Sequence, residues 1–511
     1  MSKDQTKGQT SQPNIKDGVS SQGGAPSNRS PIPEDHQEAV NHAGPLRYFA
    51  KQIKVFPRRV WGKYRKIKWL VMAVTLGIYY LAPFLRWNRG EHAPNQAILI
   101  DLYGPRAYFF GIEIWPQEVF ILTGILILAA IALFFVTSMF GRVWCGYTCP
   151  QTVWTDLFVW VERFIQGDRN ARKKLYDAPW SLTKIWKIGL THFLWIVIGV
   201  FTGGAFVLYF NDAPTLIQDI IHLDASPTIW GFIGSLTLST YIMAGFAREQ
   251  VCTYMCPYAR FQSAMFDKDT LIISYDEKRG EPRGKHKKGT EWGETGHCID
   301  CTACVQVCPV GIDIRDGLQM ECIACGLCVD ACNNVMDKLE LPRGLVRYDT
   351  TNHMEAKVKG GDEKFKFIRI RTLYYGVLMG LVGGLMLYYL LTRAPLQLHV
   401  LHDRNPVFVQ LSNGDIRNGY TIKILNKTHE ARTYTLSVEG LDNARIDVKS
   451  AGHLDAKTIH VGPDTIGSYR INLFASVKPA EARDITFTLQ DNNDPEIRAE
   501  YEGSFVTRRE R

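Results

Sequence analysis

The sequence has no cysteine outside one central stretch: none of its 12 cysteines lies before Cys145 or after Cys332. Twelve cysteines in a chain of 511 residues do not form the framework of a small disulfide-rich domain. Their absence after Cys332 also excludes an intersheet disulfide from the C-terminal part. Histidine is scarce in the long apolar runs, where only His192 occurs. A haem held by two histidines inside the membrane is therefore not expected. No secretory signal precedes the first apolar run.

Five apolar runs are long enough to cross the core of a bilayer, and they lie at 69–85, 118–140, 186–210, 228–247 and 372–392. Buried helices of a soluble domain are the alternative. However, 118–140 has no charge inside it and 186–210 has only Lys187. We therefore expect an α-helical transmembrane region of about five spans. Segment 97–115 contains Asp101, Pro105 and Arg106, so a periplasmic hairpin or surface segment is expected there, and its embedding stays open.

The basic residues gather beside these apolar runs. A net charge of +8 in a soluble protein would suggest nucleic acid, but this placement favours a membrane surface and no nucleic acid partner. Residues 46–68 carry nine Lys and Arg, loop 86–117 three, loop 141–184 seven and loop 211–227 none. The positive-inside rule then places the N-terminus in the cytoplasm and, after an odd number of spans, the C-terminus outside.

A doubled cysteine run lies between the fourth and fifth apolar runs. Both copies read C-x2-C-x2-C-x3-C, the spacing of bacterial-type ferredoxins that hold two [4Fe–4S] clusters, in which the fourth cysteine of each run binds the other cluster. We expect one cluster on Cys298, Cys301, Cys304 and Cys332, and the second on Cys322, Cys325, Cys328 and Cys308. Structural zinc is the alternative, but zinc sites usually show separate CxxC pairs.

Two details qualify this ferredoxin-type run. The first copy ends Cys308-Pro309, whereas the second ends Cys332-Asn333; this changes how the chain leaves the site but not the number of thiolates. Thiolates that hold iron need a reducing compartment, so this region is expected to face the cytoplasm. The charge pattern gives the same orientation independently.

The four remaining cysteines form a second repeat. Cys145-Gly-Tyr-Thr-Cys149-Pro follows the second span, and Cys252-Thr-Tyr-Met-Cys256-Pro follows the fourth. Cysteines four residues apart would share one face of a helix, and the proline after each pair suits the first turn of a new helix, such as an amphipathic one at 150–166.

The sequence allows three hypotheses for the chemistry of these four thiols. They bind a soft metal such as Cu(I), exchange electrons as redox-active dithiols, or hold a third iron–sulfur cluster. Alternatively, the four cysteines only pack as small apolar side chains and have no chemical role, but the duplication of the motif argues against this.

The end of the chain has the pattern of a β domain. Short alternating runs separated by Gly, Asn, Asp and Pro predict an immunoglobulin-like sandwich of about seven strands. Its histidines, at His399, His402, His453 and His460, fall on predicted strands and turns, where a single His is usually a surface residue.

The predicted fold class is therefore a multidomain membrane protein, with an α-helical transmembrane region of about five spans, a bacterial-type two-[4Fe–4S] ferredoxin domain and a C-terminal all-β immunoglobulin-like sandwich. We divide the chain into a disordered tail at 1–45, a membrane domain at 46–250 with the first four spans, a cytoplasmic ferredoxin-type domain at 251–360, the fifth span at 372–392 and a periplasmic sandwich at 395–511.

The order of these features resembles the family of cytochrome c oxidase accessory proteins called CcoG, FixG or RdxA. The G-R-V-W-C-G-Y-T-C-P-Q motif, the second C-x-Y-x-C-P, the doubled ferredoxin run and the sandwich carry the resemblance, from about residue 45 onward. It implies a bacterial inner-membrane protein that helps to assemble the cbb3-type oxidase by reducing Cu(II) to Cu(I). The eight ferredoxin-run cysteines match the family's cluster ligands, and Cys145, Cys149, Cys252 and Cys256 match its membrane-proximal cysteines.

This reading implies several partners: membrane lipid, a cytoplasmic electron donor, and copper chaperones, oxidase subunits or assembly factors outside. A quinol-oxidising membrane subunit, similar to the ferredoxin-type proteins of periplasmic nitrate reductase systems, is the competing function. Those proteins share the paired cysteine motifs, but an electron conduit would not need a sandwich. A third reading is a structural scaffold whose clusters sense redox state.

Overall fold

The computed structural model describes residues 54–90, 93–286, 292, 295–361, 365–441, 443–449, 458–476 and 482–507. The tail predicted at 1–45 and His453 lie outside them. Five helices in this part of the chain are long and apolar enough to cross a membrane: Lys63–Phe84, Pro116–Phe140, Leu182–Val207, Pro227–Ala247 and Ile370–Leu391. Their cores are α1 (Lys63–Leu81), α2 (Val119–Phe140), α6 (Leu182–Val207), α8 (Pro227–Thr240) and α14 (Ile370–Leu391).

The first helix begins six residues before the predicted start at residue 69, because its two buried basic residues pair with one acidic residue. Arg65 and Lys68 are both buried, and the Arg65 guanidinium donates to both carboxylate oxygens of Asp156 at 2.9 Å. Asp330 accepts the backbone N–H of Arg65 at 2.8 Å. Acidic residues far along the chain thus allow charged residues in the first turns of this helix. A prediction from hydropathy alone places the start of the helix too late.

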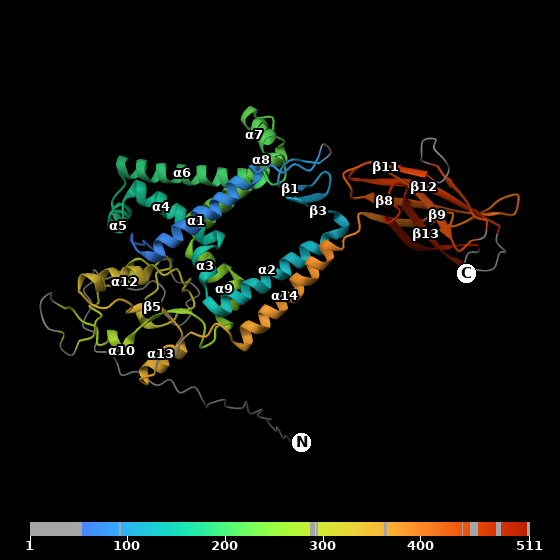
Figure 1. Cartoon of the computed structure of the whole chain (residues 1–511). Helices are drawn as coiled ribbons and strands as arrows, with labels where there is room; N and C mark the ends of the chain where they lie inside the picture. Colours follow the sequence, from blue (N-terminus) through green and yellow to red (C-terminus); the bar gives the residue numbers. More distant parts are fainter. Residues whose placement is uncertain are drawn as a thin grey trace, which may run out of the picture.

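Helices α2 and α14 pack side by side and join the two ends of the molecule (Figure 1). Not one residue in the apolar window of α14 is buried, and Leu373, Val377, Leu381 and Leu385 are exposed along it. Such a surface requires lipid contact. Helix α13 (Thr351–Val358) precedes the start of α14, and the sandwich follows its end (Figure 1).

Segment 97–115 forms a three-stranded antiparallel sheet, with β1 (Ile98–Asp101), β2 (Arg106–Phe109) and β3 (Ile112–Ile114). The chain there is extended and is not a sixth helix. A second turn, in which Phe110 has a φ of 52°, adds the third strand to the predicted hairpin.

The connections between the spans are short helices: α3 (Val143–Tyr147), α4 (Pro150–Gln166), α5 (Arg169–Asp177) and α7 (Ala213–His222). Helix α4 coincides with the amphipathic helix expected at 150–166, and it buries Phe158 and Val161 against Trp195 of α6. The π-helical segments Tyr241–Ala247 and Val251–Met255 lead from α8 into the second cysteine motif.

The ferredoxin-type region consists of short elements around two loops: α9 (Pro257–Ala264), β4 (Ile272–Tyr275), α10 (Glu277–Gly280), α11 (Ala303–Gln306), α12 (Leu327–Lys338), β5 (Val346–Asp349) and α13 (Thr351–Val358). Strands β4 and β5 pair antiparallel. Asn333, which replaces the proline of the first run, lies inside α12, so the chain continues there as a helix.

The C-terminal sandwich has two antiparallel sheets. One has the order β10-β12-β8-β6 with β7 beside β8, and the other has the order β11-β9-β13-β14. The strands are β6 (Leu396–His402), β7 (Val409–Gln410), β8 (Ile416–Asn426), β9 (Arg432–Glu439), β10 (Arg445–Val448), β11 (Thr458–Val461), β12 (Thr465–Ala475), β13 (Arg483–Asp491) and β14 (Arg498–Phe505).

Nine strands thus replace the predicted seven among the described residues, because the short strands β7 and β10 carry too little alternation to recognise in the sequence. The two sheets share an apolar core that includes Tyr420, Tyr434 and Phe487.

A buried ion pair ties the sandwich to the membrane region. Glu118, at the start of the second span, has no exposed surface, and Lys427 of the sandwich donates to it at 2.6 Å. Arg393 lies 3.4 Å from the other oxygen of this carboxylate. Removing one member of such a pair leaves a buried charge without its partner.

Glu118→Gln should therefore weaken the attachment of the sandwich by roughly 3–5 kcal/mol. Hydrogen exchange of residues 113–118 and 427–431 should become faster. Glu355→Gln is the matched control, because Glu355 pairs with Lys268 at 3.1 Å on an exposed surface, where a pair contributes about 1 kcal/mol or less. Equal exchange in both variants would contradict the role assigned to Glu118.

Candidate metal centre

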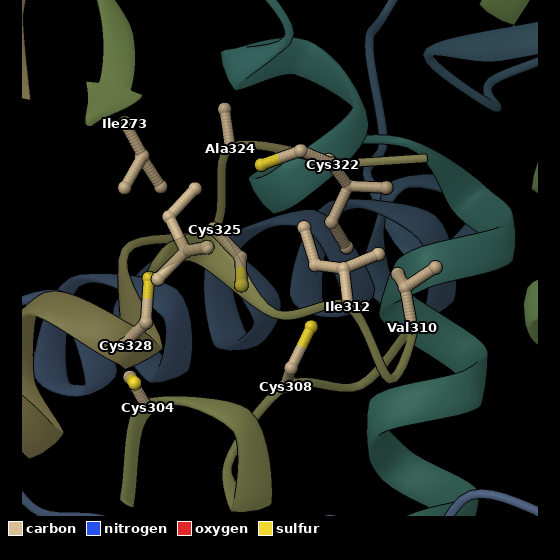
Figure 2. Close-up of a pocket in the computed structure, with 11 residues that line it drawn as sticks. Ile273, Cys304, Cys308, Val310, Ile312, Cys322, Ala324, Cys325 and Cys328 are labelled. Atoms are coloured by element: carbon tan, nitrogen blue, oxygen red, sulfur yellow. The ribbon is translucent and has the colours of Figure 1, made fainter. Parts of the chain in front are cut away.

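Four cysteines of the doubled run surround one apolar cavity. Cys308, Cys322, Cys325 and Cys328 line it, and Figure 2 shows them with Ile273, Val310 and Ile312 around the same space. Three of these cysteines come from the second run, and Cys308 is the fourth cysteine of the first. The fold therefore brings the crossed set expected from the spacing to a single cavity.

The other four cysteines line a neighbouring cavity. Cys298, Cys301, Cys304 and Cys332 border it together with Tyr275, Val346 and other apolar side chains. Cys304 also reaches the lining of the first cavity (Figure 2). The second cavity has three cysteines without Cys304, whereas the first already has four. If each cavity holds four thiolates, as the spacing predicts, Cys304 belongs to the second.

The two cysteine loops follow the same local path. Asp300 and Thr302 have φ angles of 53° and 52°, and Ala324 and Gly326, at the matching positions of the second run, have 53° and 74°. These left-handed residues curl each loop around its cavity. Backbone N–H groups then hydrogen-bond the thiols: Ala303 donates to Cys301, Ala324 to Cys322, and Val310 and Ile312 to Cys308.

Burial makes these thiols poor acids. It raises the pKa of Cys308 and of Cys332 to about 12 and that of Cys322 to about 11, and neighbouring cysteines add to the effect. The pKa values of Cys304 and Cys328 are well above the usual range for the same reason. Thiolates held here need cations beside them, which iron supplies. An all-sulfur donor set in two apolar cavities fits two iron–sulfur cubanes.

The two C-x-Y-x-C-P motifs differ from the expected helical arrangement. Cys145 lies in α3, which ends at Tyr147, and Cys149 is the residue before α4. Cys252 lies in the π-helical segment that ends at Met255, and Cys256 is the residue before α9. Each pair therefore does not share one helical face: as expected from the proline, a new helix begins directly after the second cysteine.

The four motif cysteines lie near enough to influence one another's charge, although among the described residues no three of their sulfur atoms lie within 4.8 Å of one another. Electrostatic repulsion from Cys149 and Cys256 raises the pKa of Cys145 beyond the effect of its burial. The pKa of Cys252, raised to about 12, rises through burial and then through Cys149 and Cys145. We call these four residues, Cys145, Cys149, Cys252 and Cys256, the thiol quartet.

Gln262 of α9 connects the two motifs. It is fully buried, and the Cys145 thiol donates to its side-chain oxygen at 3.3 Å. Arg142 donates to the same oxygen at 3.0 Å, and the Gln262 amide donates to Thr137 at 3.3 Å. No pattern in the sequence marks this residue, because its partners are separated from it by well over a hundred positions.

The first motif packs directly against the loop that carries Cys322, Cys325 and Cys328. Tyr147 donates its hydroxyl hydrogen to the Cys325 carbonyl oxygen at 3.0 Å. A Cβ on Gly146 would lie 2.6 Å from the carbonyl oxygen of Ile323. Cys145 belongs to the same apolar cluster as Cys325, Cys308 and Val310. Cys145 of the quartet therefore packs against the same residues that line the first cavity.

The second motif does not repeat this contact, since Tyr254, the counterpart of Tyr147, is 60% exposed. Instead, Cys252 borders a separate cavity together with Pro309, Val310 and Ile323, next to the buried charges of Lys68, Asp156 and Arg248. Both copies of the motif thus lie next to Ile323 of the second cysteine run, but each copy does so through different residues.

Comparison with family models agrees with these features. Residues 247–351 match a 4Fe-4S dicluster domain, residues 122–169 match a 4Fe-4S binding domain, and residues 386–508 match the IG-like fold at the C-terminal of FixG. The first match covers all eight cysteines of the doubled run. Together with the all-sulfur donor set, it identifies two [4Fe–4S] clusters as cofactors and the chain as a membrane iron–sulfur protein.

Curated relatives are similar over most of the chain. Nitrogen fixation protein FixG of Rhizobium meliloti is 49% identical in an alignment of 468 residues that covers 85% of this chain and 89% of the relative. Protein RdxA of Cereibacter sphaeroides is 45% identical over 455 residues, 88% and 96% of the two chains. A crystal structure of a FixG-related protein from Vibrio parahaemolyticus is 28% identical with a TM-score of 0.19, covering 22% of this chain and 96% of that one.

Gly146→Ala should separate the first motif from the second cysteine run. The added methyl group overlaps the Ile323 carbonyl oxygen at 2.6 Å, and relief of such overlap costs roughly 1–3 kcal/mol. Iron release to a chelator, followed by the loss of visible absorbance, should become faster. Gly234→Ala in α8 is the control, because a Cβ there meets nothing within 4 Å. Equal release from both variants would contradict the importance of this packing.

Proposed function

The chain belongs to the FixG/RdxA family, and we propose that it is a membrane-bound cupric reductase that converts Cu(II) to Cu(I) during assembly of a cbb3-type cytochrome c oxidase. The observation that carries the proposal is the packing of the thiol quartet against the second cysteine run. Tyr147 and Gly146 hold Cys145 in one apolar cluster with Cys308 and Cys325. A site for a thiophilic metal thus adjoins a redox cofactor.

The ligand sets in this proposal follow the two cavities. One cluster is held by Cys298, Cys301, Cys304 and Cys332, and the other by Cys308, Cys322, Cys325 and Cys328. When bound, such clusters supply one-electron chemistry over a range of about −700 to +450 mV. The apolar lining of both cavities excludes water, and the N–H groups aimed at the sulfurs stabilise the thiolates.

Copper is the substrate in this proposal, and the quartet is its site. Thiolates bind Cu(I) in preference to harder ions, so a site of four sulfurs favours the reduced product. Each Cu(II) gains one electron, which must come from a cytoplasmic donor of low potential. Arg142, which donates to Gln262 beside Cys145, also lowers the cost of thiolate charge at Cys145 and Cys252.

The proposed topology places the ferredoxin-type region in the cytoplasm and the sandwich in the periplasm of a bacterial inner membrane. The basic residues of loops 46–68 and 141–184 support this orientation. The separation of the two regions at opposite ends of α2 and α14 also supports it (Figure 1). We propose domains at 46–250, 251–360 and 395–511. The sandwich then docks copper chaperones, oxidase subunits or assembly factors.

A second candidate role for the quartet is a third iron–sulfur cluster. The match of residues 122–169 to a 4Fe-4S binding domain favours it, because this segment contains Cys145 and Cys149. The two roles differ in metal content. Anaerobically purified protein contains about eight iron atoms per chain with two cubanes and about twelve with a third four-iron cluster.

The crossed ligand sets can be tested by substitution. Cys308→Ser and Cys328→Ser should alter the same cluster signal in the EPR spectrum of the reduced protein, although Cys308 belongs to the other sequence run. Cys301→Ser and Cys332→Ser should both alter the second signal. A Cys308→Ser spectrum that resembles that of Cys301→Ser would show that each run binds its own cluster.

The quartet gives a second prediction. The combined Cys145→Ser and Cys256→Ser substitution should lower the rate of Cu(II) reduction at least tenfold, because it removes two of the four thiolates. The visible absorbance of the clusters should stay unchanged. Copper reduction is followed with a Cu(I)-specific chelating dye in anaerobic buffer.

Met255→Leu is the matched control, since Met255 is exposed and adjoins Cys256 without contributing a thiol. Copper reduction at the normal rate in the double serine variant would remove the quartet from the reaction. Wild-type protein that oxidises a quinol analogue and leaves Cu(II) unreduced would favour the quinol-oxidising function instead. Clusters that lose iron in a cycle of reduction and reoxidation would favour a redox-sensing scaffold.

A further inference from the structure

A group of possible metal ligands lies where the three-stranded sheet meets the sandwich. Glu113 belongs to β3, His429 follows β8, and Asp464 precedes β12. One ligand atom from each of the three residues lies within 4.8 Å of the other two. His429 was not among the histidines that the sequence singled out, and its two partners come from distant parts of the chain.

The two carboxylates are buried and incompletely paired. Glu113 is 5% exposed and Asp464 is 4% exposed. Among the described residues, Oε1 of Glu113 and Oδ1 of Asp464 are buried without a hydrogen-bond partner. Two buried acidic groups so close together repel each other, and buried polar atoms are normally satisfied. Burial, and then the charge of Asp464, raises the pKa of Glu113.

The nearby arginines are engaged with other groups. Arg106 donates to the backbone carbonyl of Asp464 at 2.5 Å, and its guanidinium lies 3.9 Å from the centre of the Trp115 ring. The Arg89 side chain donates to backbone carbonyls, among them that of Phe110 at 2.7 Å. Both arginines lower the energy of a charged Glu113 from a distance. Neither satisfies the two free oxygens.

A simple hydrogen-bonded pair explains only part of this arrangement. His429 Nδ1 lies 2.7 Å from Oδ2 of Asp464, which accounts for those two atoms. It leaves Oδ1 of Asp464 and Oε1 of Glu113 without a hydrogen-bond partner. A cation between the three side chains would satisfy these oxygens and cancel the repulsion between the acids.

We propose that Glu113, His429 and Asp464 bind a divalent transition-metal ion of the Zn(II) or Cu(II) class. One imidazole nitrogen with two carboxylate oxygens is a ligand set for such ions, whereas Ca(II) and Mg(II) prefer oxygen ligands alone. The His429 side chain is half exposed, so an ion can enter from solvent. The bound ion joins β3 to the sandwich beside the Glu118–Lys427 pair, since Arg393 donates to the backbone carbonyl of Glu113 and also lies 3.4 Å from the Glu118 carboxylate. This site does not depend on the proposed cupric reductase activity.

The test uses the full-length protein in lipid nanodiscs, washed with chelator, with Zn(II) as the probe. Zn(II) should slow amide hydrogen exchange in residues 427–431 and 462–465 at least tenfold. His429→Ala should abolish this protection, and Glu113→Gln should raise the Zn(II) concentration needed for it at least tenfold. His399→Ala is the matched control, because His399 is an exposed histidine on β6 of the same domain. Zinc that binds to the cysteines would change hydrogen exchange near the cysteines and not in residues 427–431 and 462–465.

Unchanged exchange of these two segments in the wild-type protein would overturn the proposal, and so would full protection in His429→Ala. Faster exchange throughout the sandwich of Glu113→Gln without zinc would mean that this variant is damaged. In that case the His429→Ala variant provides the test, because replacing this exposed side chain leaves the apolar core unchanged.

Discussion

The backbone of Gly146 lies directly against the carbonyl oxygens of Ile323 and Ala324, with no room for a side chain between them. This contact brings a segment that follows a membrane span against a loop of the ferredoxin-type region. The Tyr147 hydroxyl group then reaches the Cys325 carbonyl, and Cys145 enters the same apolar cluster. Two cysteine-bearing parts of the chain thereby become one packed unit, and the proposed chemistry depends on this proximity.

Buried ion pairs hold the membrane region to its neighbours. In lipid, the apolar surfaces of helices gain little by meeting one another, so polar contacts have a large share in fixing their positions. Asp156 pairs with Arg65 at one end of the spans, and Glu118 pairs with Lys427 at the other. Glu162 joins Arg172 and Arg248 in the same way. Each carboxylate joins segments that are distant in sequence, so these pairs determine how the helices assemble.

The two ends of the molecule differ in the metal chemistry that their donor sets favour. The cytoplasmic end of the proposed topology offers sulfur, in two cysteine-lined cavities and in the thiol quartet. The other end offers one imidazole and two carboxylates, at Glu113, His429 and Asp464. Sulfur suits iron–sulfur clusters and Cu(I), whereas the nitrogen and oxygen set suits divalent ions. In the proposed topology, the membrane lies between the sulfur ligands and the nitrogen and oxygen ligands of the same chain.

Local patterns in the sequence determined the parts of the fold that local physics controls. The length and hydropathy of each span identified five membrane helices, and the close spacing of the doubled cysteine run identified two clusters, because one loop supplies most ligands of each. The start of α1 was misplaced, since its buried Arg65 needs Asp156, which no nearby residue signals.

Only the tertiary structure brought Cys145 to Gln262, the quartet to the Cys325 loop, and Glu113 to Asp464. These groups meet because of how the spans and the sandwich pack, and no period or spacing along the chain records that packing.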